Sequence, residues 1–376
     1  MKYYIIAGEA SGDMHGANLM REILYQDPNA EIRYWGGDRM AAVVGHTTMV
    51  KHIRDLAFMG FVEVALNAKT VLGNLSFCKQ DILNYNPDAL VFIDYPGFNL
   101  KIAKFTKEHG YKNFYYISPQ IWAWKQGRIK AMRRDIYKLC YILPSERAYY
   151  ASVDFPQAQY VGHPLLDEVK NYRLQPAEKM ALGDKKVIAL LPGSRKQELN
   201  KVLPFMLRLA DNHPEYQFVI AGMKLLGDEF YGKFITQNHK NISVVYDRTY
   251  DLLSQSYAAV VCSGTATLET ALFRVPQVVC YRGNAITIGI AAFFIKRMGK
   301  LKYISLVNLI ADAPVVKELI QNDVNDSTLE TEFAKISVDS ASRHSMLEGY
   351  DRMIEILGNE GASQRTAGII CNDIMK

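Results

Sequence analysis

The sequence predicts an α/β protein made of two Rossmann-like domains, each a doubly wound parallel sheet. Apolar β-branched runs alternate with segments of helical periodicity along most of the 376 residues, a pattern typical of parallel strands covered by helices on both faces. The alternation stops in a polar stretch, 167–184, and starts again at Lys186. Because a chain of this length exceeds one hydrophobic core, we expect two domains that face each other across a ligand cleft.

The first half of the chain holds six expected strands. The first is apolar and ends in a small-residue turn, and the segment after it, 14–25, repeats its apolar residues at helical spacing. The expected strands cover 2–8, 31–37, 89–94, 113–117, 139–143 and 160–164. Further helices are expected over most of 57–85, after the YPGFN segment as far as Lys107, and in a basic segment before residue 139.

The second half repeats this alternation and defines the domain boundary. Five strands are expected, over 187–191, 217–221, 243–246, 259–262 and 277–281, and the chain is expected to be helical from about Val315. The polar stretch without strands serves as the linker, so the N-terminal domain covers 1–166 and the C-terminal domain 167–354. We expect a last helix, about 355–376, to complete the N-terminal domain.

Composition narrows the possible functions. An apolar fraction of 49% with 22% charged residues argues against disorder. A net charge of +5 suits phosphate-bearing substrates or an anionic membrane surface, and it is too small to indicate nucleic acid. The five cysteines are scattered, and no His, Cys, Asp and Glu residues have metal-ligand spacing. We therefore expect neither a metal nor a cofactor.

The ends and apolar runs bear on location. The chain opens directly into a strand-like run, so we expect no signal peptide. Its longest apolar run, 285–295, is far shorter than the roughly 20 residues that span a bilayer. A cytoplasmic protein is the expectation.

Two glycine turns in the second half point to a bound nucleotide. Each follows an apolar strand and opens into a helix, an arrangement that directs free backbone N–H groups and the helix dipole at a ligand. The first turn carries Gly193, Ser194 and Arg195, whose guanidinium suits phosphate oxygens. The second carries Gly264 and Thr265; the carboxylate of Glu269, five residues after Gly264, can reach the vicinal hydroxyls of a ribose.

Acidic residues at the first and third strand ends are candidates for substrate chemistry. Asp94 ends its strand at the edge where parallel sheets bind ligands, and it is the leading candidate for a general base, with a helix N-cap as the alternative. The segment GEASGD places Glu9, Ser11 and Asp13 at the first strand end, either facing a polar substrate group or forming an ordinary turn. His163 orients a cleft residue or phosphate, or belongs to a hinge turn.

Two tryptophans precede the basic helix. Trp122 and Trp124 follow the expected strand at 113–117, and lysines and arginines come next. Such a pair fits a hydrophobic core or a membrane interface.

The motifs together resemble the lipid-A-disaccharide synthase family over nearly the whole chain. The matching blocks are GEASGD (8–13), GFVEV (60–64), IDYPGFN (93–99), ISPQIWAWK (117–125), YVGHPLLDE (160–168), LLPGSR (190–195), SGTATLE (263–269), YISLVNLI (303–310) and VKELIQ (316–321). The chain departs from the family pattern at Val307, where proline is usual, and at Gln120 and Gln126. We expect these changes to alter loop stiffness and leave the chemistry in place.

This resemblance implies a metal-independent, inverting glycosyltransferase of the GT-B type. The implied reaction moves 2,3-diacylglucosamine from its UDP donor to the 6-hydroxyl of 2,3-diacylglucosamine 1-phosphate. Its products are the β-1,6-linked lipid A disaccharide 1-phosphate of lipopolysaccharide biosynthesis and UDP. The implied partners are these two substrates and the inner-membrane surface on its cytoplasmic face, with a homo-oligomer possible and no nucleic acid.

The resemblance also assigns roles to residues. Asp94 matches the family's essential aspartate, and Arg195 with the two turns would hold the leaving UDP. Glu269 matches a ribose-binding glutamate, while Asn308 and Gln321 match positions near the nucleotide. Glu9, Ser11, Asp13 and His163 would lie on the acceptor side.

An apolar stretch suggests contact with lipid. Its side chains exceed the single stripe that a core helix buries, and basic residues lie nearby, so part of it is expected at a membrane surface and part in the core. The expected lipid-facing residues are Phe58, Met59, Phe61, Val62, Leu66, Leu72 and Leu75.

Two other functions fit the same motifs. One is another GT-B UDP-sugar enzyme, either an epimerase or a peptidoglycan-precursor glycosyltransferase. The other is a non-catalytic nucleotide-sugar-binding protein. The apolar stretch argues against an epimerase, and Asp94 argues against a pure binding protein, which needs no base.

Overall fold

The computed structural model describes residues 1–56, 68–119, 127–176, 179–235, 239–262, 264–283 and 302–375, and it divides into two compact units. The N-terminal unit comprises Met1–Asp167 with Asn359–Lys376, and the C-terminal unit comprises Glu168–Gly358. Each unit contains one parallel sheet with helices on both sides. The predicted α/β class with two doubly wound parallel sheets is thus confirmed.

The sheet of the N-terminal unit has seven strands in the order β3-β2-β1-β4-β5-β6-β7. These are β1 (Lys2–Ala7), β2 (Glu31–Gly36), β3 (Met49–His52), β4 (Ala89–Ile93), β5 (Asn113–Tyr116), β6 (Lys138–Tyr141) and β7 (Ala158–Tyr160). The helices are α1 (Ala10–Gln26), α2 (Asp38–Val44), α4 (Ala68–Tyr85), α5 (Pro96–Glu108), α6 (Arg128–Asp135), α7 (Glu146–Ser152) and α17 (Ala362–Ile374), with a 3-10 turn η1 (Ile53–Leu56). Helix α8 (Pro164–Arg173) runs across the boundary between the units.

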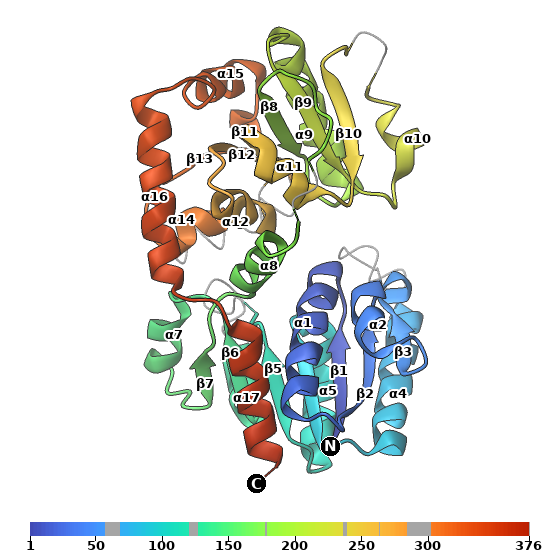
Figure 1. The fold of residues 1–376 in the computed structure, drawn as a ribbon. Helices are drawn as coiled ribbons and strands as arrows, with labels where there is room; N and C mark the ends of the chain where they lie inside the picture. The colour runs from blue at the N-terminus through green and yellow to red at the C-terminus, as the bar shows by residue number, and fades with distance from the viewer. Residues whose placement is uncertain are drawn as a thin grey trace. The chain divides into compact units, whose positions relative to one another are not determined.

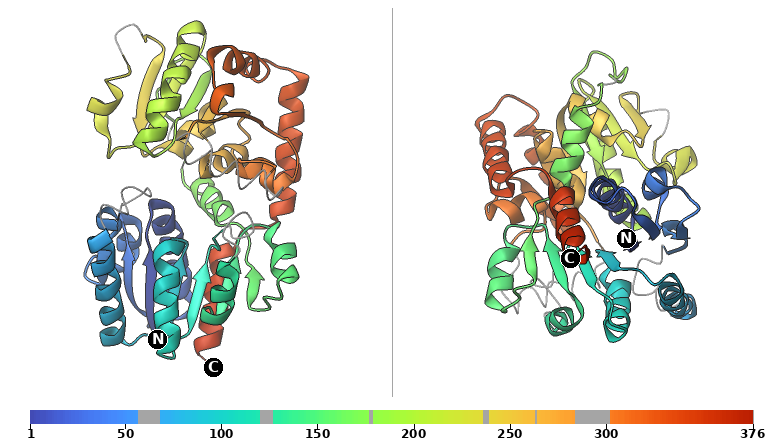
Figure 2. Two further views of the ribbon diagram at one scale, coloured as in Figure 1. Left: turned by 180° about the vertical axis from the view of Figure 1, so that it is seen from behind. Right: turned by 60° about the horizontal axis from the view of Figure 1, so that its bottom comes forward.

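Strand β1 shows why this sheet has a core on each face. Side chains alternate along a strand, so Tyr3 and Ile5 pack under α1, α2 and α17, while Tyr4 and Ile6 pack under α4, α5 and α6. All four are fully buried, and each contributes roughly 1.5–3 kcal/mol from burial. Figure 1 shows the side with α1 and α17, and the left view of Figure 2 shows the side with α4 and α5.

The sheet of the C-terminal unit has six strands in the order β10-β9-β8-β11-β12-β13. These are β8 (Val187–Leu191), β9 (Gln217–Gly222), β10 (Ile242–Tyr246), β11 (Ser256–Cys262), β12 (Gln277–Tyr281) and β13 (Lys317–Ile320). The helices are α9 (Lys196–Asn212), α10 (Gly227–Tyr231), α11 (Thr249–Gln255), α12 (Thr265–Leu272), α14 (Leu306–Ala311), α15 (Asp326–Ala334) and α16 (Ala341–Leu357), with a 3-10 turn η2 (Gln321–Asp323).

Two sequence-based expectations about elements are wrong. The chain after Val315 is not all helical, because Lys317–Ile320 pairs with β12 as an edge strand; its Lys, Glu and Leu favour helices locally, and strand pairing overrides that preference. The strand expected over 160–164 ends at Tyr160, since Pro164 begins α8, where a missing N–H costs nothing. The stretch expected as the linker, 167–184, starts within α8, which ends at Arg173.

Candidate active site

The carboxyl ends of β1 and β4 lie side by side in the N-terminal unit. The two strands are paired in parallel, with Ala7 opposite Ile93. The segment that follows β1 therefore starts next to the segment that follows β4. Glu9 is the N-cap of α1, and Tyr95 is the N-cap of α5, which begins at Pro96. This pairing brings together Glu9 and Asp94, two of the predicted site residues.

The backbone at Asp94 is held in an unusual conformation. Asp94 and Tyr95 both have positive φ, 44° and 48°, which costs non-glycine residues of order 1–3 kcal/mol each and persists only where neighbours enforce it. The Asp94 carbonyl accepts hydrogen bonds from Asn99 Nδ2 (2.8 Å) and from the Tyr115 hydroxyl (2.6 Å). The Asp94 amide donates to the Tyr116 carbonyl at 3.1 Å. These bonds fix the backbone at the strand end, and the N-cap of α5 is Tyr95 rather than Asp94.

The environment of Asp94 tunes its carboxyl for proton transfer. Burial raises its pKa to about 6, the negative charge of Glu9 adds to the rise, and a hydrogen bond from the Tyr95 backbone opposes it. A carboxylate with this pKa is mostly ionised at neutral pH, yet it holds a proton far more readily than an exposed aspartate. Such a group suits general-base chemistry near neutral pH.

Gly8 makes room for an aromatic ring beside Asp94. A Cβ on Gly8 would lie only 2.4 Å from the ring atoms of Tyr95. The same ring stacks on Phe98, with centroids 5.6 Å apart and an interplanar angle of 24°. The absence of a side chain at Gly8 therefore allows Tyr95 to lie across the turn after β1.

The three acceptor-side candidates at α1 have different surroundings. Ser11 is exposed in the first turn of the helix, and Glu9 is partly exposed, with no capping bond from its side chain. Asp13 is buried, and its carboxylate accepts hydrogen bonds from the backbone amides of Gly37 (2.6 Å), Arg39 (3.0 Å) and Met40 (3.1 Å). Asp13 thus serves the start of α2, and this use argues against the expected contact with the acceptor.

His163 is an internal residue of its turn. It is 3% exposed, and its Nδ1 accepts a hydrogen bond from the Leu165 amide at 3.3 Å. Burial lowers its pKa to about 3, and neighbouring His15 contributes to the lowering, so the imidazole is neutral at physiological pH. This geometry agrees with the alternative of a turn-forming histidine better than with phosphate binding.

In the C-terminal unit, two glycine turns follow neighbouring strands. Strands β8 and β11 are paired in parallel, so the turn at Gly193 and the turn at Gly264 open at the same edge of the sheet. Both glycines have positive φ, 98° and 147°, which side chains tolerate poorly. A Cβ on Gly193 would lie 3.1 Å from Glu198 Oε2, and one on Gly264 would meet no atom within 4 Å.

The residues that follow these turns expose polar groups. Ser194 and Thr265 are exposed. The Arg195 side chain is 59% exposed, and its Nη1 lies 3.4 Å from Glu198 Oε1. Glu269, on α12, accepts a hydrogen bond from the Tyr250 hydroxyl at 2.9 Å. Together with the N-termini of α9 and α12, this edge offers fixed positive potential and hydrogen-bonding groups for an anion.

The two remaining nucleotide candidates differ. Asn308 is buried. Its side-chain Nδ2 donates to the Val316 carbonyl (2.9 Å) and to the Glu318 carboxylate (3.0 Å), and its Oδ1 accepts from the Val316 amide (2.9 Å). It joins α14 to β13, and both of its side-chain N–H groups are used, contrary to the expected nucleotide contact. Gln321 has a φ of 55°, and its Oε1 accepts a hydrogen bond from the Gly283 amide at 3.2 Å, so it lies beside the turn that follows β12.

Sequence reasoning missed several side chains at this edge. Lys201 donates to the Gly283 carbonyl at 2.7 Å, and the Arg282 guanidinium lies over the Phe205 ring, 4.9 Å from its centroid. Glu198 pairs with Arg195, and its Oε2 lies 3.1 Å from where a Cβ on Gly193 would be. Glu198 could have been found from its spacing, because a residue three positions after the helix N-cap points back toward the turn.

Most of the expected lipid-facing residues and both tryptophans lie outside the described residues. These are Phe58, Met59, Phe61, Val62, Leu66, Trp122 and Trp124. Of the remaining two, Leu72 is 63% exposed on α4, as a surface role requires. Leu75 is 7% exposed and packs in the core under α4; its expected surface position is wrong because it falls on the helix stripe that faces the sheet.

Two negative findings apply to the described ranges only. Within them, no group of three or more His, Cys, Asp and Glu side chains could hold a metal ion. Nor does any helix there have the length and apolarity that crossing a bilayer requires.

Comparison with known proteins adds to this geometry. A family model described as lipid-A-disaccharide synthetase matches residues 3–369. The chain is 35% identical over 373 residues to the lipid-A-disaccharide synthase of Geobacter sulfurreducens, covering 97% of this chain and 95% of that protein. It is 36% identical over 373 residues to the one from Trichlorobacter lovleyi, covering 97% and 96%.

Solved structures share the fold at low sequence identity. UDP-GlcNAc 2-epimerase from Neisseria meningitidis bound to UDP-GlcNAc is similar with a TM-score of 0.65 and 12% identity, covering 100% of both chains. The glycotransferase of kitacinnamycin is similar with a TM-score of 0.64 and 14% identity, covering 99% of this chain and 98% of that one. These similarities support the GT-B architecture.

Proposed function

Because the chain belongs to the lipid-A-disaccharide synthase family, we propose that it joins two acylated glucosamines. Membership confirms the resemblance carried by the motifs and identifies the chain as a glycosyltransferase of lipid A biosynthesis. The proposed reaction transfers 2,3-diacylglucosamine from its UDP derivative to the 6-hydroxyl of 2,3-diacylglucosamine 1-phosphate. The products are the β-1,6-linked disaccharide 1-phosphate and UDP.

The observation that carries this proposal is the half-buried Asp94 directly after β4, with its raised pKa. An inverting displacement needs one base that takes the proton from the attacking hydroxyl as the new bond forms. Asp94 has a backbone fixed by three hydrogen bonds and a pKa near 6. Glu9 and Ser11 lie at the neighbouring strand end and helix start, where they would hold other polar groups of the acceptor.

The C-terminal unit would bind the UDP. Negative charge develops on the diphosphate as the glycosidic bond to UDP breaks, and oriented N–H groups with a guanidinium stabilise it. The turns at Gly193 and Gly264 and the exposed Arg195 are placed to do this at one sheet edge. Ser194 and Thr265 would add hydroxyls, Glu269 would accept hydrogen bonds from the ribose, and Gln321 would lie near the base through the turn after β12.

The test of the proposed function is Asp94→Ala. We expect disaccharide formation from the two purified substrates to fall by roughly 10²–10⁴-fold, the range that a general base contributes, while UDP binding measured by calorimetry stays within twofold. Asp88→Asn is the matched control, because Asp88 lies at the other end of β4, where its carboxylate accepts a hydrogen bond from the Lys2 amide at 2.7 Å. Undiminished disaccharide formation by Asp94→Ala would contradict the assignment, and release of free UDP-sugar epimer in place of a disaccharide would contradict the reaction.

We also propose that the enzyme reaches its acylated substrates as a peripheral protein of the inner membrane. The helices α4, α5 and α6, which cover one side of the N-terminal sheet, carry nine basic side chains against three acidic ones, a net charge of +6. The helices α1, α2 and α17 on the other side carry three basic and four acidic side chains, a net charge of −1. The basic side also exposes Leu72 and Phe77, by 63% and 50%. A basic surface with exposed apolar side chains suits anionic headgroups.

Co-sedimentation with liposomes tests this localisation. We expect Leu72→Ser with Phe77→Ser to reduce binding to vesicles of phosphatidylglycerol and phosphatidylethanolamine several-fold. Tyr25→Ser is the control, because Tyr25 is 79% exposed on α1, on the other side of the sheet. Equal loss in both proteins, or loss in neither, would count against this surface.

A further inference from the structure

Glu198 is an acidic side chain at the predicted phosphate turn, where it pairs with Arg195. It stands three residues after Arg195, in the first turn of α9. Its Oε1 lies 3.4 Å from Arg195 Nη1. Its Oε2 is so close to the backbone of the turn that a Cβ on Gly193 would be 3.1 Å away. The carboxylate therefore lies where the turn, the helix N-terminus and the guanidinium all attract a negative charge.

Neighbouring strands enclose this carboxylate. The Glu198 side chain is only 18% exposed, although its partner Arg195 is 59% exposed. Cys262 at the end of β11 lies 3.5 Å from the same Cβ position. Tyr281 at the end of β12 has a pKa raised by burial and, next, by the charge of Glu198. Among the described residues, the charged or titratable groups near Glu198 include Arg195, Tyr281 and Cys262.

We propose that the Glu198 carboxylate is an internal counter-ion that occupies the phosphate-binding turn, so that a diphosphate must displace it from Arg195 to bind. This inference rests on the proposed function, because it takes a nucleoside diphosphate as the ligand of the turn. An acidic residue in the first turn of a helix ordinarily stabilises the helix. Here the carboxylate at this position also pairs with Arg195, and its negative charge weakens the binding of a diphosphate by repulsion.

The consequence for catalysis is faster release of product. UDP carries the same diphosphate as the donor, and after transfer it lacks the sugar contacts. A carboxylate that returns to Arg195 favours departure of UDP from the turn. The side chain would thus limit product inhibition at the cost of some donor affinity.

A second consequence is proton uptake. Burial raises the pKa of Glu198, and Arg195 opposes this rise by its positive charge and hydrogen bond. When a diphosphate takes Arg195 and adds its own negative charge, the pKa of Glu198 must rise further. Binding of UDP should therefore take up protons and weaken as the pH increases.

The experiment is calorimetry of UDP binding to the full-length protein with Glu198→Gln. We expect the variant to bind UDP roughly 3- to 10-fold more tightly, the effect of removing one nearby like charge. Titrations in two buffers of different ionisation enthalpy should show less proton uptake by the variant than by the wild type. The protonation of UDP itself cancels in this comparison.

Glu332→Gln is the matched control. Glu332 forms an i,i+3 ion pair with Lys335 at 2.7 Å on α15 of the same unit, and its side chain is 15% exposed. This control should bind UDP as the wild type does. Equal or weaker UDP binding by Glu198→Gln, with unchanged proton uptake, would overturn the inference and leave the proposed function standing. Failure of the wild type and both variants to bind UDP would instead refute the nucleotide site and this inference with it.

Discussion

The two sheet edges that carry the candidate site differ in how they are built. In the N-terminal unit, Asp94 is half-buried and has a positive φ, and three hydrogen bonds to its backbone hold this conformation. In the C-terminal unit, positive φ falls on Gly193 and Gly264, and the Arg195 side chain is exposed. The first edge fixes the backbone of an acidic residue, whereas the second presents backbone N–H groups and an exposed guanidinium.

This difference corresponds to the two tasks of glycosyl transfer. A proton acceptor needs burial and a fixed position, because both its pKa and its distance to the hydroxyl must be right. A diphosphate has several oxygens with distributed charge, so backbone amides, helix dipoles and an exposed guanidinium can bind it without a perturbed pKa. We therefore expect substitutions at the first edge to change pH dependence and packing, and those at the second to change charge stabilisation.

After Asp94→Ala, the largest effect in this comparison is expected from Arg195→Ala. Loss of one charged contact to the leaving diphosphate should lower kcat by about 10²–10³, or about 2.7–4 kcal/mol of transition-state stabilisation. Arg195→Lys should recover only part, because an ammonium lacks the planar fork. Steady-state kinetics of disaccharide formation measures both variants.

Arg208→Ala is the control for Arg195. Arg208 lies on the same helix, is 48% exposed and pairs with Asp326 at 2.9 Å. Equal loss of activity in the two variants would mean that the kinetics reports general damage to α9 rather than charge at the turn.

The sequence predicts the positions of these strand ends better than the use of each side chain. Apolar strands followed by glycine or acidic turns reveal where the edges lie, which explains why Asp94 and Gly193 fall on them. Asp13 and Asn308 have the same residue types as ligand-binding groups, but the folded chain uses them to bond α2 and β13. Such partners are distant in sequence, so spacing alone cannot tell a structural amide or carboxylate from a functional one.

The next largest effect is expected from Gly8→Ala. The added Cβ would meet the Tyr95 ring at 2.4 Å, and overpacking of this kind costs about 1–3 kcal/mol. The ring would have to move from its position beside Asp94, so activity should fall together with stability. Chemical denaturation and kinetics on the same protein measure the two losses.

Gly97→Ala provides a nearby control for that substitution. A Cβ on Gly97 meets no atom within 4 Å, and the residue lies in the first turn of α5 without positive φ. Stability should stay the same or rise by up to about 1 kcal/mol, as for glycine to alanine at a compatible position. A large loss of stability in Gly97→Ala would mean that alanine is poorly tolerated throughout this turn. The loss in Gly8→Ala could then not be assigned to the clash with Tyr95.

The pH dependence of the rate should reflect the N-terminal edge. With a pKa of about 6, Asp94 becomes protonated as the pH falls, so kcat/KM should drop on the acid side with a midpoint near 6. Glu9→Gln removes the charge that adds to this rise, so the midpoint should move to lower pH while burial keeps it above the ordinary aspartate value. Glu22→Gln, on the same helix α1, should leave the midpoint in place. An unchanged midpoint in Glu9→Gln would show that the charge of Glu9 does not raise the pKa of Asp94.

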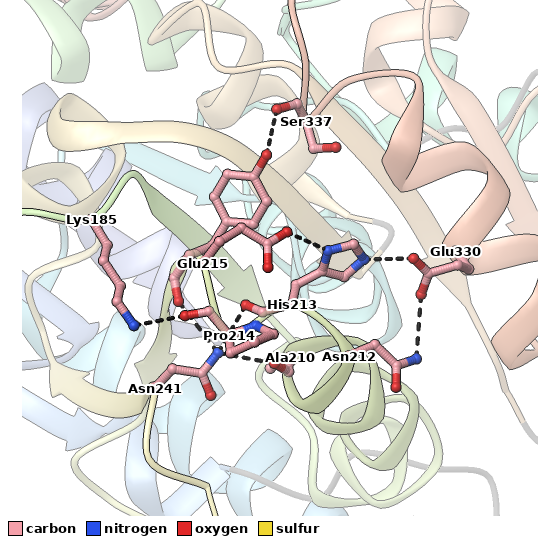
Figure 3. A network of polar contacts seen from close by, with 10 residues as sticks. Lys185, Ala210, Asn212, His213, Pro214, Glu215, Asn241, Glu330 and Ser337 are labelled. Carbon is pink, nitrogen blue, oxygen red and sulfur yellow. Dashed lines mark hydrogen bonds and ion pairs between the residues drawn. The ribbon is translucent and has the colours of Figure 1, made fainter.

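The smallest effect concerns His213, which follows α9 and lies away from the turns at Gly193 and Gly264. Figure 3 shows it between Glu215 (2.8 Å) and Glu330 (2.5 Å), where α9 ends before β9 begins. Burial lowers the pKa of His213, but hydrogen bonds and charge from both glutamates outweigh burial, so the net shift is upward. A raised pKa means that the folded protein binds the proton more tightly than the unfolded chain does. The stabilisation is therefore full below the unfolded value of about 6.5 and disappears as the pH rises through the folded value.

His213→Gln should therefore lower the free energy of unfolding by about 1 kcal/mol or less at pH 5.5 and by less at pH 8.5, since the glutamates are 57% and 39% exposed to screening solvent. Urea denaturation at the two pH values measures the difference. His344→Gln is the control, because His344 pairs with Asp339 on a surface where its side chain is 62% exposed. If instead His213→Gln shifted the acid midpoint of kcat/KM, His213 would affect the reaction itself. The prediction that His213 contributes only to stability would then be wrong. An unchanged midpoint of kcat/KM, together with a pH-dependent loss of stability, would show that His213 contributes to folding alone. The acid limb of the rate would then be assigned to Asp94.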